Sequence, residues 1–179
     1  MTHPPITTPS ASAPPSCSAL LHDWIVERHL PRSAAGVGRC SRADLAAALG
    51  PGVDGTGRYS SIERAFTRYE PDGLRVRAVW GPSDLMLLVV EDLKVPAGPL
   101  VGELGEADEQ WPSRTSALGW SIRDHVYARA GLTLSVGTSL DDPPLASTVL
   151  VAYLYEPTTV TDYVERLGGK DEWVRRFQR

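Results

Sequence analysis

Leucine followed by glycine ends two short apolar segments, DLAAALG at 44–50 and PLVGELG at 99–105, and this repetition constrains the fold more than any other feature. Glycine readily adopts the left-handed conformation that ends a helix, so each Leu-Gly pair predicts the end of a short helix. The first helix also has a start signal, because Ser41 is a favoured N-cap and the acidic Asp44 follows three positions later.

The segments after the two helices correspond in order as well. A Ser-Ile pair recurs at 61–62 and 121–122, a Gly-Leu pair opens a strand at 73–74 and 131–132, and an apolar strand ends at a glutamate in each half. Each half thus predicts a short helix, a glycine-rich loop, a strand, a turn, a strand, a turn and an apolar strand. We expect an α+β protein, in which two tandem units of a helix and a three-stranded antiparallel meander form one sheet.

The segment SIERAFTRYE at 61–70 fits a helix or a hairpin strand equally well by its own spacing. Its counterpart at 121–129, SIRDHVYAR, has no helical stripe, and a duplicated unit should use one secondary structure. Both segments are therefore predicted to be strands.

The next strand of each unit alternates between apolar and polar residues, which predicts a half-buried strand. The residues expected to face helices are Leu74, Val76, Ala78 and Trp80 in the first unit and Leu132, Leu134 and Val136 in the second. The residues expected to face the other way are Arg75, Arg77, Thr133 and Ser135.

Further segments flank the two units. Residues 1–17 are Pro, Ser, Thr and Ala-rich and predict a disordered tail. A helix is expected from residue 18 up to Pro31, and helices again after residue 157. The predicted organisation is a tail at 1–17, an N-terminal helix with the first unit at 18–96, and the second unit with C-terminal helices at 97–179.

Composition and charge argue against several classes of protein. A net charge of -4 disfavours nucleic-acid binding. The N-terminal residues lack the pattern of a secretory signal, and no apolar run reaches membrane-spanning length, so we expect a cytoplasmic protein without a membrane partner. The basic residues are sixteen arginines and only Lys94 and Lys170, which suggests the coding bias of a GC-rich bacterium such as an actinobacterium.

The two cysteines, Cys17 and Cys40, do not have the spacing of a thiolate metal site. Two free thiols in the cytosol are the favoured interpretation, and a single disulfide is the alternative. Four scattered histidines without ligand spacing predict no metal, and no motif predicts a cofactor.

The segments DLAAALGPGV with DGLRVRAVW, and PLVGELGEAD with GLTLSV, resemble the BamE-like fold. The duplicated form of this fold occurs in the beta-lactamase inhibitory proteins of Streptomyces, which are secreted and stapled by disulfides within each repeat. The resemblance covers residues 41–156 in pattern, and this chain lacks paired cysteines in both units. It implies the tandem architecture and a leaning toward protein binding.

The third strand of each unit, at 85–90 and 149–155, is apolar on both faces and must be covered on both. Either the C-terminal helices or a partner protein supplies the second cover. Exposed aromatic residues among arginines are typical of a protein interface, whereas an ordinary two-sided core is the alternative. The candidate binding residues are Arg75, Arg77, Trp120, Tyr127, Arg129, Tyr153 and Tyr155.

The leading hypothesis is thus a non-catalytic protein-binding protein. The alternative is a small-molecule-binding protein or cofactor-independent enzyme with a cavity between sheet and helices. His125 would then act as acid or base, with Asp124, Tyr127 and Arg129 nearby. An ordinary structural role is the simpler interpretation of His125. The acidic cluster that follows the second predicted helix is expected to be a solvated loop.

Overall fold

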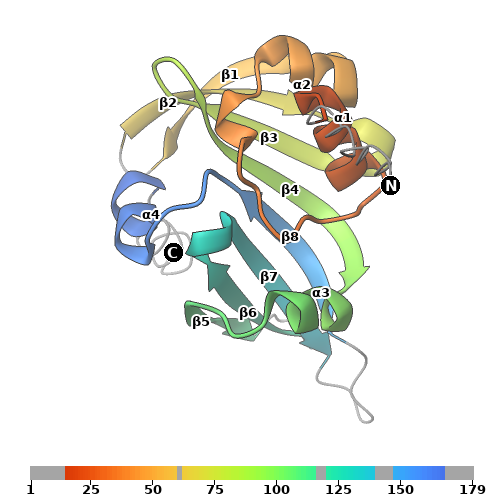
Figure 1. Ribbon diagram of the computed structural model, residues 1–179, viewed down its shortest axis with the longest axis vertical. Coiled ribbons are helices and arrows are strands. Elements are labelled where there is room, and N and C mark those ends of the chain that lie inside the picture. The colour runs from red at the N-terminus through yellow and green to blue at the C-terminus, as the bar shows by residue number, and fades with distance from the viewer. Residues whose placement is uncertain (1–14, 60–61, 116–119, 140–146, 168–179) are drawn as a thin grey trace, which may run out of the picture.

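The computed structural model describes residues 15–59, 62–115, 120–139 and 147–167. Within them, one antiparallel sheet of eight strands is accompanied by four α-helices, which confirms the α+β class (Figure 1). The strands are β1 (Val53–Tyr59), β2 (Ile62–Tyr69), β3 (Arg75–Trp80), β4 (Leu85–Pro96), β5 (Glu109–Thr115), β6 (Trp120–Tyr127), β7 (Leu132–Ser139) and β8 (Thr148–Leu154). The helices are α1 (Cys17–Leu21), α2 (Arg42–Leu49), α3 (Ala97–Leu104) and α4 (Val160–Leu167).

The sheet has the strand order β1-β2-β3-β4-β8-β7-β6-β5, so β4 and β8 meet at its centre. The ambiguous segment at 61–70 and its counterpart at 121–129 form strands, β2 and β6, as predicted. The expectation of three strands in each half is wrong, because each half contributes four consecutive strands. The extra strands, β1 and β5, lie in the segments expected to be loops.

Strand β1 forms despite two glycines, which ordinarily weaken a strand. Its residues pair with β2 over the full length, from Val53 opposite Arg68 to Tyr59 opposite Ile62. The ring of Phe66 in β2 lies over Gly55, where a Cβ would come within 2.6 Å of it. A neighbouring side chain thus fills the space that the glycine leaves, and sheet context overrides local propensity.

The ends of α2 confirm the predicted capping. The Ser41 hydroxyl accepts from the Asp44 backbone N–H at 3.1 Å, and the Asp44 carboxylate accepts from the Ser41 backbone N–H at 2.8 Å. This reciprocal pair is a capping box. Gly50 and Gly105, which follow α2 and α3, have the positive φ values of 86° and 75° that favour glycine, but their ψ values of -170° and -149° differ from those of the left-handed helical conformation.

Two predicted boundaries are wrong. The N-terminal helix was expected to reach Pro31, but α1 continues only as a π-helical turn to Val26, and Arg28 has a left-handed φ of 59°. The spacer expected after Glu91 is instead the end of β4, where the register shifts between Glu91 and Val95. Left-handed conformations at Asp92 and Lys94 make this bulge possible.

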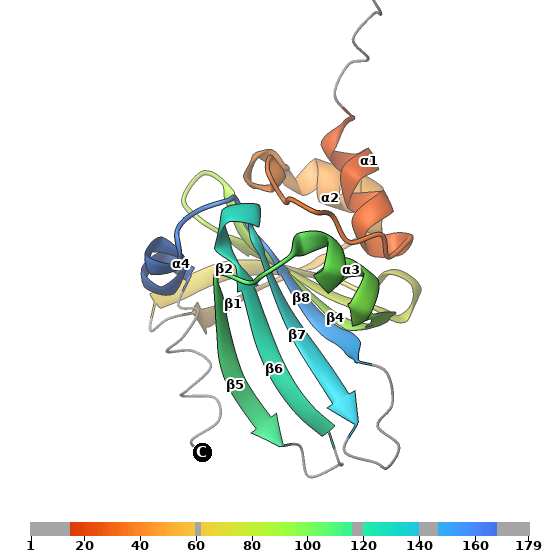
Figure 2. The same cartoon turned by 60° about the horizontal axis from the view of Figure 1, so that its bottom comes forward.

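The two faces of the sheet carry different helices, and Figure 2 shows α4 set apart from the other three. On one face, here called the α2 face, α1, α2 and α3 cover the main core. The helix-facing residues predicted for β3 and β7 are buried there: Leu74, Val76, Ala78, Trp80, Leu132, Leu134 and Val136. The opposite face is here called the α4 face.

Helix α4 covers part of the α4 face with an aromatic stack. The Tyr163 ring lies 4.5 Å from the Tyr155 ring and 5.9 Å from the Trp111 ring, measured between ring centres. Tyr153 is also buried on this face, with only 7% of its surface exposed. The second cover for the apolar strand β8 thus comes from the chain itself.

Cys17 and Cys40 form a disulfide, with their Cα atoms 5.6 Å apart, so the favoured interpretation of two free thiols is wrong. The two residues are 23 positions apart, and the packing of α1 against α2 brings them together. The predicted boundary between tail and domain therefore falls inside α1, while residues 1–14 lie outside the described part. Cytosolic proteins rarely keep structural disulfides, so this bond argues against the predicted cytoplasmic location, which stays a prediction.

We expect thiol titration of the denatured, unreduced protein to detect no free thiol, because the chain has two cysteines and both are in the disulfide. Reduction before denaturation should release two thiols per chain. Two thiols without reduction would contradict the disulfide.

Candidate binding surface

The residues predicted to bind a partner do not form one surface. Arg75, Arg77, Tyr153 and Tyr155 share the α4 face, but both tyrosines are buried. Tyr127 is buried in the core of the opposite face, and Arg129 lies in the 3₁₀ turn Ala128–Ala130. The side chain of Trp120 lies outside the described part of the structure.

The alternative acid–base residues are likewise separated. Asp124 is only 1% exposed and accepts a 2.6 Å hydrogen bond from the Ser135 hydroxyl, and burial raises the pKa of its carboxyl to about 6. His125 is its neighbour on β6, and successive side chains of a strand point to opposite faces. Burial, and to a lesser degree Arg123, lowers the pKa of His125. The two groups therefore do not form an acid–base pair.

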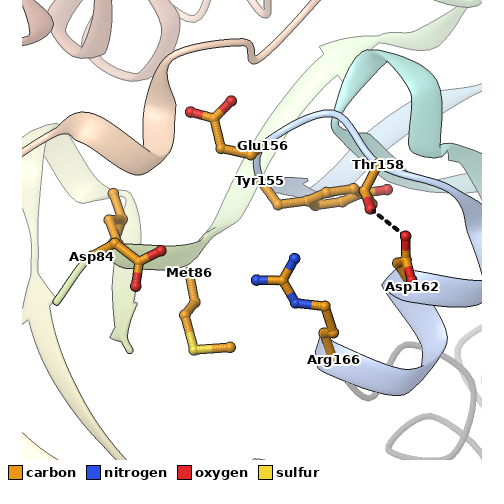
Figure 3. Close-up of a pocket in the computed structure, with 8 residues that line it drawn as sticks. Asp84, Met86, Tyr155, Glu156, Thr158, Asp162 and Arg166 are labelled. Atoms are coloured by element: carbon orange, nitrogen blue, oxygen red, sulfur yellow. Dashed lines mark hydrogen bonds between the residues drawn. The ribbon is translucent and has the colours of Figure 1, made fainter. Parts of the chain in front are cut away.

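A pocket of about 210 Å³ lies between the β3–β4 turn, the end of β8 and α4 (Figure 3). Arg166 of α4 points into it, and carboxylates of Asp84, Glu156 and Asp162 surround it. Glu156 is already engaged, because its oxygens accept the backbone N–H groups of Gly36 at 3.1 Å and Gly38 at 2.8 Å. The glycine-rich loop at 36–39 thus binds a carboxylate of the chain itself.

Two larger depressions are lined in part by charged side chains. One, of about 760 Å³, lies beside the start of α2, and its lining includes Arg42. The Arg42 guanidinium donates at 2.8 Å to Asp54, which lies outside this lining. The other, of about 430 Å³, contains the Arg32–Glu103 pair at 2.9 Å. It is also lined by two predicted binding residues, Tyr127 and Arg129, and Arg129 is paired with Asp108. Neither these two depressions nor the pocket of about 210 Å³ beside α4 is lined by His125 or Asp124.

The α4 face of β2 and β3 carries an unneutralised group of arginines. Thr67 and Tyr69 of β2 are buried on the α2 face, so the intervening residues of β2 point to the α4 face. We call the group formed by Arg64, Phe66, Arg68 and Arg77 the arginine patch.

Contacts on the α4 face organise the patch. The Arg77 guanidinium lies 5.6 Å from the centre of the Phe66 ring, a cation–π arrangement. Arg68 stands directly opposite Arg77 in the β2–β3 pairing and opposite Val53 in the β1–β2 pairing. Val53 is 62% exposed and is the one large apolar side chain that is exposed among the described residues. Cationic and apolar groups therefore lie side by side.

The patch keeps its positive charge. No carboxylate among the described residues forms an ion pair with Arg64, Arg68 or Arg77. Arg75, two residues before Arg77 on the same face of β3, is different. Its guanidinium lies 2.8 Å from Asp92 and 3.7 Å from Glu91. Like charges placed directly opposite each other in a sheet are destabilising, so the Arg68–Arg77 pair weakens the fold slightly.

Of the four patch residues, Arg77 alone was predicted from the sequence. The alternation Arg64-x-Phe66-x-Arg68 is visible once 62–69 is taken as a strand, and it could have identified the rest of the surface. Its significance depends on which face the helices leave uncovered, and that is a property of the tertiary structure.

Among the described residues, no cluster of three or more His, Cys, Asp or Glu side chains could hold a metal ion. No helix in the same part of the chain has both the length and the apolar character needed to cross a membrane. Comparison of the chain with protein-family models, curated proteins and solved structures found no match.

Proposed function

We propose that this chain is a non-catalytic binding protein whose arginine patch engages an acidic segment of a partner protein. The observation that carries this proposal is the unneutralised pair of Arg68 and Arg77 on opposed positions of β2 and β3. The fold holds these two like charges together in a chain of net charge -4. An anionic partner would relieve the repulsion and gain charge-assisted hydrogen bonds.

The composition of the patch fits a protein ligand. Guanidinium groups bind carboxylates through two parallel hydrogen bonds, and arginine is enriched in protein interfaces together with aromatic residues. Phe66, between Gly55 and Arg77, supplies an apolar surface next to these charges. A partner segment that alternates acidic and apolar residues would match both features of the surface.

We also infer that the two halves are copies of one unit. In each, a short helix that ends at Leu-Gly precedes four consecutive antiparallel strands, and the last strands of the two halves pair at the centre. Helices α1 and α4 would then be additions at the two ends. The sequence resemblance to the BamE-like fold and its leaning toward protein binding remain part of this proposal.

The alternative of a small-molecule protein or an enzyme rests on His125, Asp124, Tyr127 and Arg129. Tyr127 and Arg129 both line the depression of about 430 Å³, but His125 and Asp124 line none of the pockets described above. Tyr127 and Asp124 also belong to opposite sides of the sheet. We therefore favour the protein partner.

Replacing both Arg68 and Arg77 with alanine should weaken binding of an acidic peptide at least about tenfold, a loss of about 1.4 kcal/mol. The probe is a fluorescent peptide of alternating glutamate and leucine, followed by fluorescence anisotropy. Binding to the unmodified protein should weaken as salt rises, because exposed charges are screened.

Arg39→Ala is the matched control, because Arg39 is exposed, lies outside the strands that carry the arginine patch and forms no ion pair with a described carboxylate. It should leave the affinity unchanged. A peptide with glutamine in place of glutamate should not bind. Equal affinities of the double variant and the unmodified protein would rule out the patch.

A further inference from the structure

Strand β1 is an open edge of the sheet. It pairs with β2 on one side, and no described strand lies on its other side. The opposite edge strand, β5, contains Pro112, which cannot donate a ladder hydrogen bond and so discourages pairing. Strand β1 has no proline and no lysine, the two residues most used to protect an edge, and its two charged side chains have opposite signs.

The sequence of β1, VDGTGRY, is complementary to itself in the antiparallel direction. With Thr56 at the centre, Asp54 and Arg58 lie two positions away on either side. Gly55 and Gly57 flank Thr56 directly. In an antiparallel pair centred on Thr56, each aspartate stands opposite an arginine and each glycine opposite a glycine.

The two charged side chains are available for such pairing. Asp54 uses its Oδ1 atom to accept from Arg42 at 2.8 Å and from Thr67 at 2.6 Å, and its side chain is still 75% exposed. Its Oδ2 atom accepts no hydrogen bond from a described residue. Arg58 is exposed and has no ion pair with a described carboxylate. Both residues alternate with Gly55 and Gly57 and so share the α2 face.

We propose that a second copy of this chain pairs with β1 in the antiparallel direction, about a two-fold axis at Thr56. Asp54 of each copy then meets Arg58 of the other, which gives two equivalent ion pairs. Such an isologous contact closes on itself and yields a dimer with one continuous sheet across the two chains. Strand pairing satisfies the free backbone groups of both edges.

The other residues of β1 fit this contact. Gly55 and Gly57 leave no Cβ on the α4 face, where the Phe66 ring already lies over Gly55. The second copy would also cover Val53, the exposed apolar residue at the start of the strand. The dimer does not depend on the proposed peptide binding, because Arg58 and Asp54 face away from the arginine patch.

The first test is sedimentation velocity of the full chain over a wide range of concentration. We expect a reversible dimer with twice the mass of the chain. Arg58→Glu would place two glutamates opposite two aspartates and should weaken the dimer at least tenfold. Arg58→Lys should dimerise nearly as well as the unmodified protein, and Arg39→Glu, with the same charge change away from β1, should have no effect.

The register is tested with Thr56→Cys and a short thiol-to-thiol crosslinker. Residues directly opposed in an antiparallel pair have Cβ atoms about 4.5–5.5 Å apart, so two Thr56→Cys chains should crosslink efficiently. Ala47→Cys, exposed on α2, is the control and should not crosslink. A monomer at every concentration would overturn the proposal, as would a dimer that is insensitive to Arg58→Glu and does not crosslink at position 56.

Discussion

Replacement of Gly131 with alanine is expected to lower the free energy of unfolding by about 4 kcal/mol, a large fraction of the roughly 5–15 kcal/mol that stabilises a typical domain. Gly131 lies between the 3₁₀ turn Ala128–Ala130 and β7, with a φ of +74°. Two effects add. A left-handed conformation costs an alanine roughly 1–2 kcal/mol. In addition, a Cβ at this position would overlap the backbone oxygen of Tyr155 and lie 3.1 Å from the backbone N of Pro157.

The overlap cannot be relieved by a side-chain movement, because the atoms that it meets are backbone atoms. The Tyr155 N–H donates to the Gly131 carbonyl at 2.9 Å, so the two segments are held close together. Moving them apart would break this bond and shift the end of β8, from which the chain leads into α4. We therefore expect the cost of the substitution to lie at the upper end of the range for overpacking.

Gly73→Ala is the matched control for this substitution. Gly73 occupies the corresponding place before β3, with a φ of +77°, but no atom lies within 4 Å of the position that a Cβ would take there. It should lose only the cost of the left-handed conformation, roughly 1–2 kcal/mol. Denaturant unfolding followed by circular dichroism measures both variants, and equal losses would show that the contact with Tyr155 does not restrict position 131.

The short-range features of the fold could be predicted because their causes are local. The N-cap at Ser41 depends on a hydroxyl and a carboxylate three residues apart, and Gly50 and Gly105 supply the conformation that ends a helix. The alternation in β3 and β7 follows from burial of one face. Comparison of the two halves also identified 62–69 as a strand where its own spacing left the choice open.

Features with long-range causes could not be predicted. Strand β1 depends on a partner strand and on the ring of Phe66, and its own composition indicates a loop. The disulfide depends on how α1 packs against α2, which the spacing of Cys17 and Cys40 does not reveal. In each case, a contact with another element of the fold determines the outcome, and the segment's own composition or spacing does not reveal it.

The candidate surface shows the same limit. Arg75 and Arg77 are equivalent in the sequence pattern, yet Arg75 is neutralised by Asp92, which reaches it through the bulge in β4. Tyr153 and Tyr155 were expected at an interface, but Tyr163 of α4 completes their cover. Which charge remains free and which aromatic group remains exposed are determined by the tertiary structure.

Asp124 illustrates a buried charge that opposes folding above its pKa. It lies on the α4 face with one hydrogen bond from Ser135, and burial raises the pKa of its carboxyl from 3.8 to about 6. The folded state therefore binds a proton more tightly than the unfolded state does. The contribution of Asp124 to stability is highest below the unfolded pKa, falls as the pH rises from about 4 to about 6, and then stays level, with a total loss of about 3 kcal/mol.

Asp124→Asn should remove this pH dependence, because the amide is neutral at every pH and its oxygen can still accept from Ser135. The variant's free energy of unfolding, minus that of the unmodified protein, should rise by about 3 kcal/mol between pH 4 and pH 8. The titration of His125 and of the other acidic groups is common to both chains and largely cancels in this difference. Urea unfolding at a series of pH values measures it.

Ser135→Ala is the control, and it should increase the pH dependence of stability that Asp124→Asn removes. The Ser135 hydroxyl stabilises the charged form of Asp124, so its removal should raise the carboxyl pKa further and extend the loss of stability to higher pH. A pH-independent difference between Asp124→Asn and the unmodified protein would mean that the carboxylate reaches water in the folded state. In that case the cover that β6, β7 and α4 provide would have to open. The result thus tests the packing of α4 as well as the ionisation of one residue.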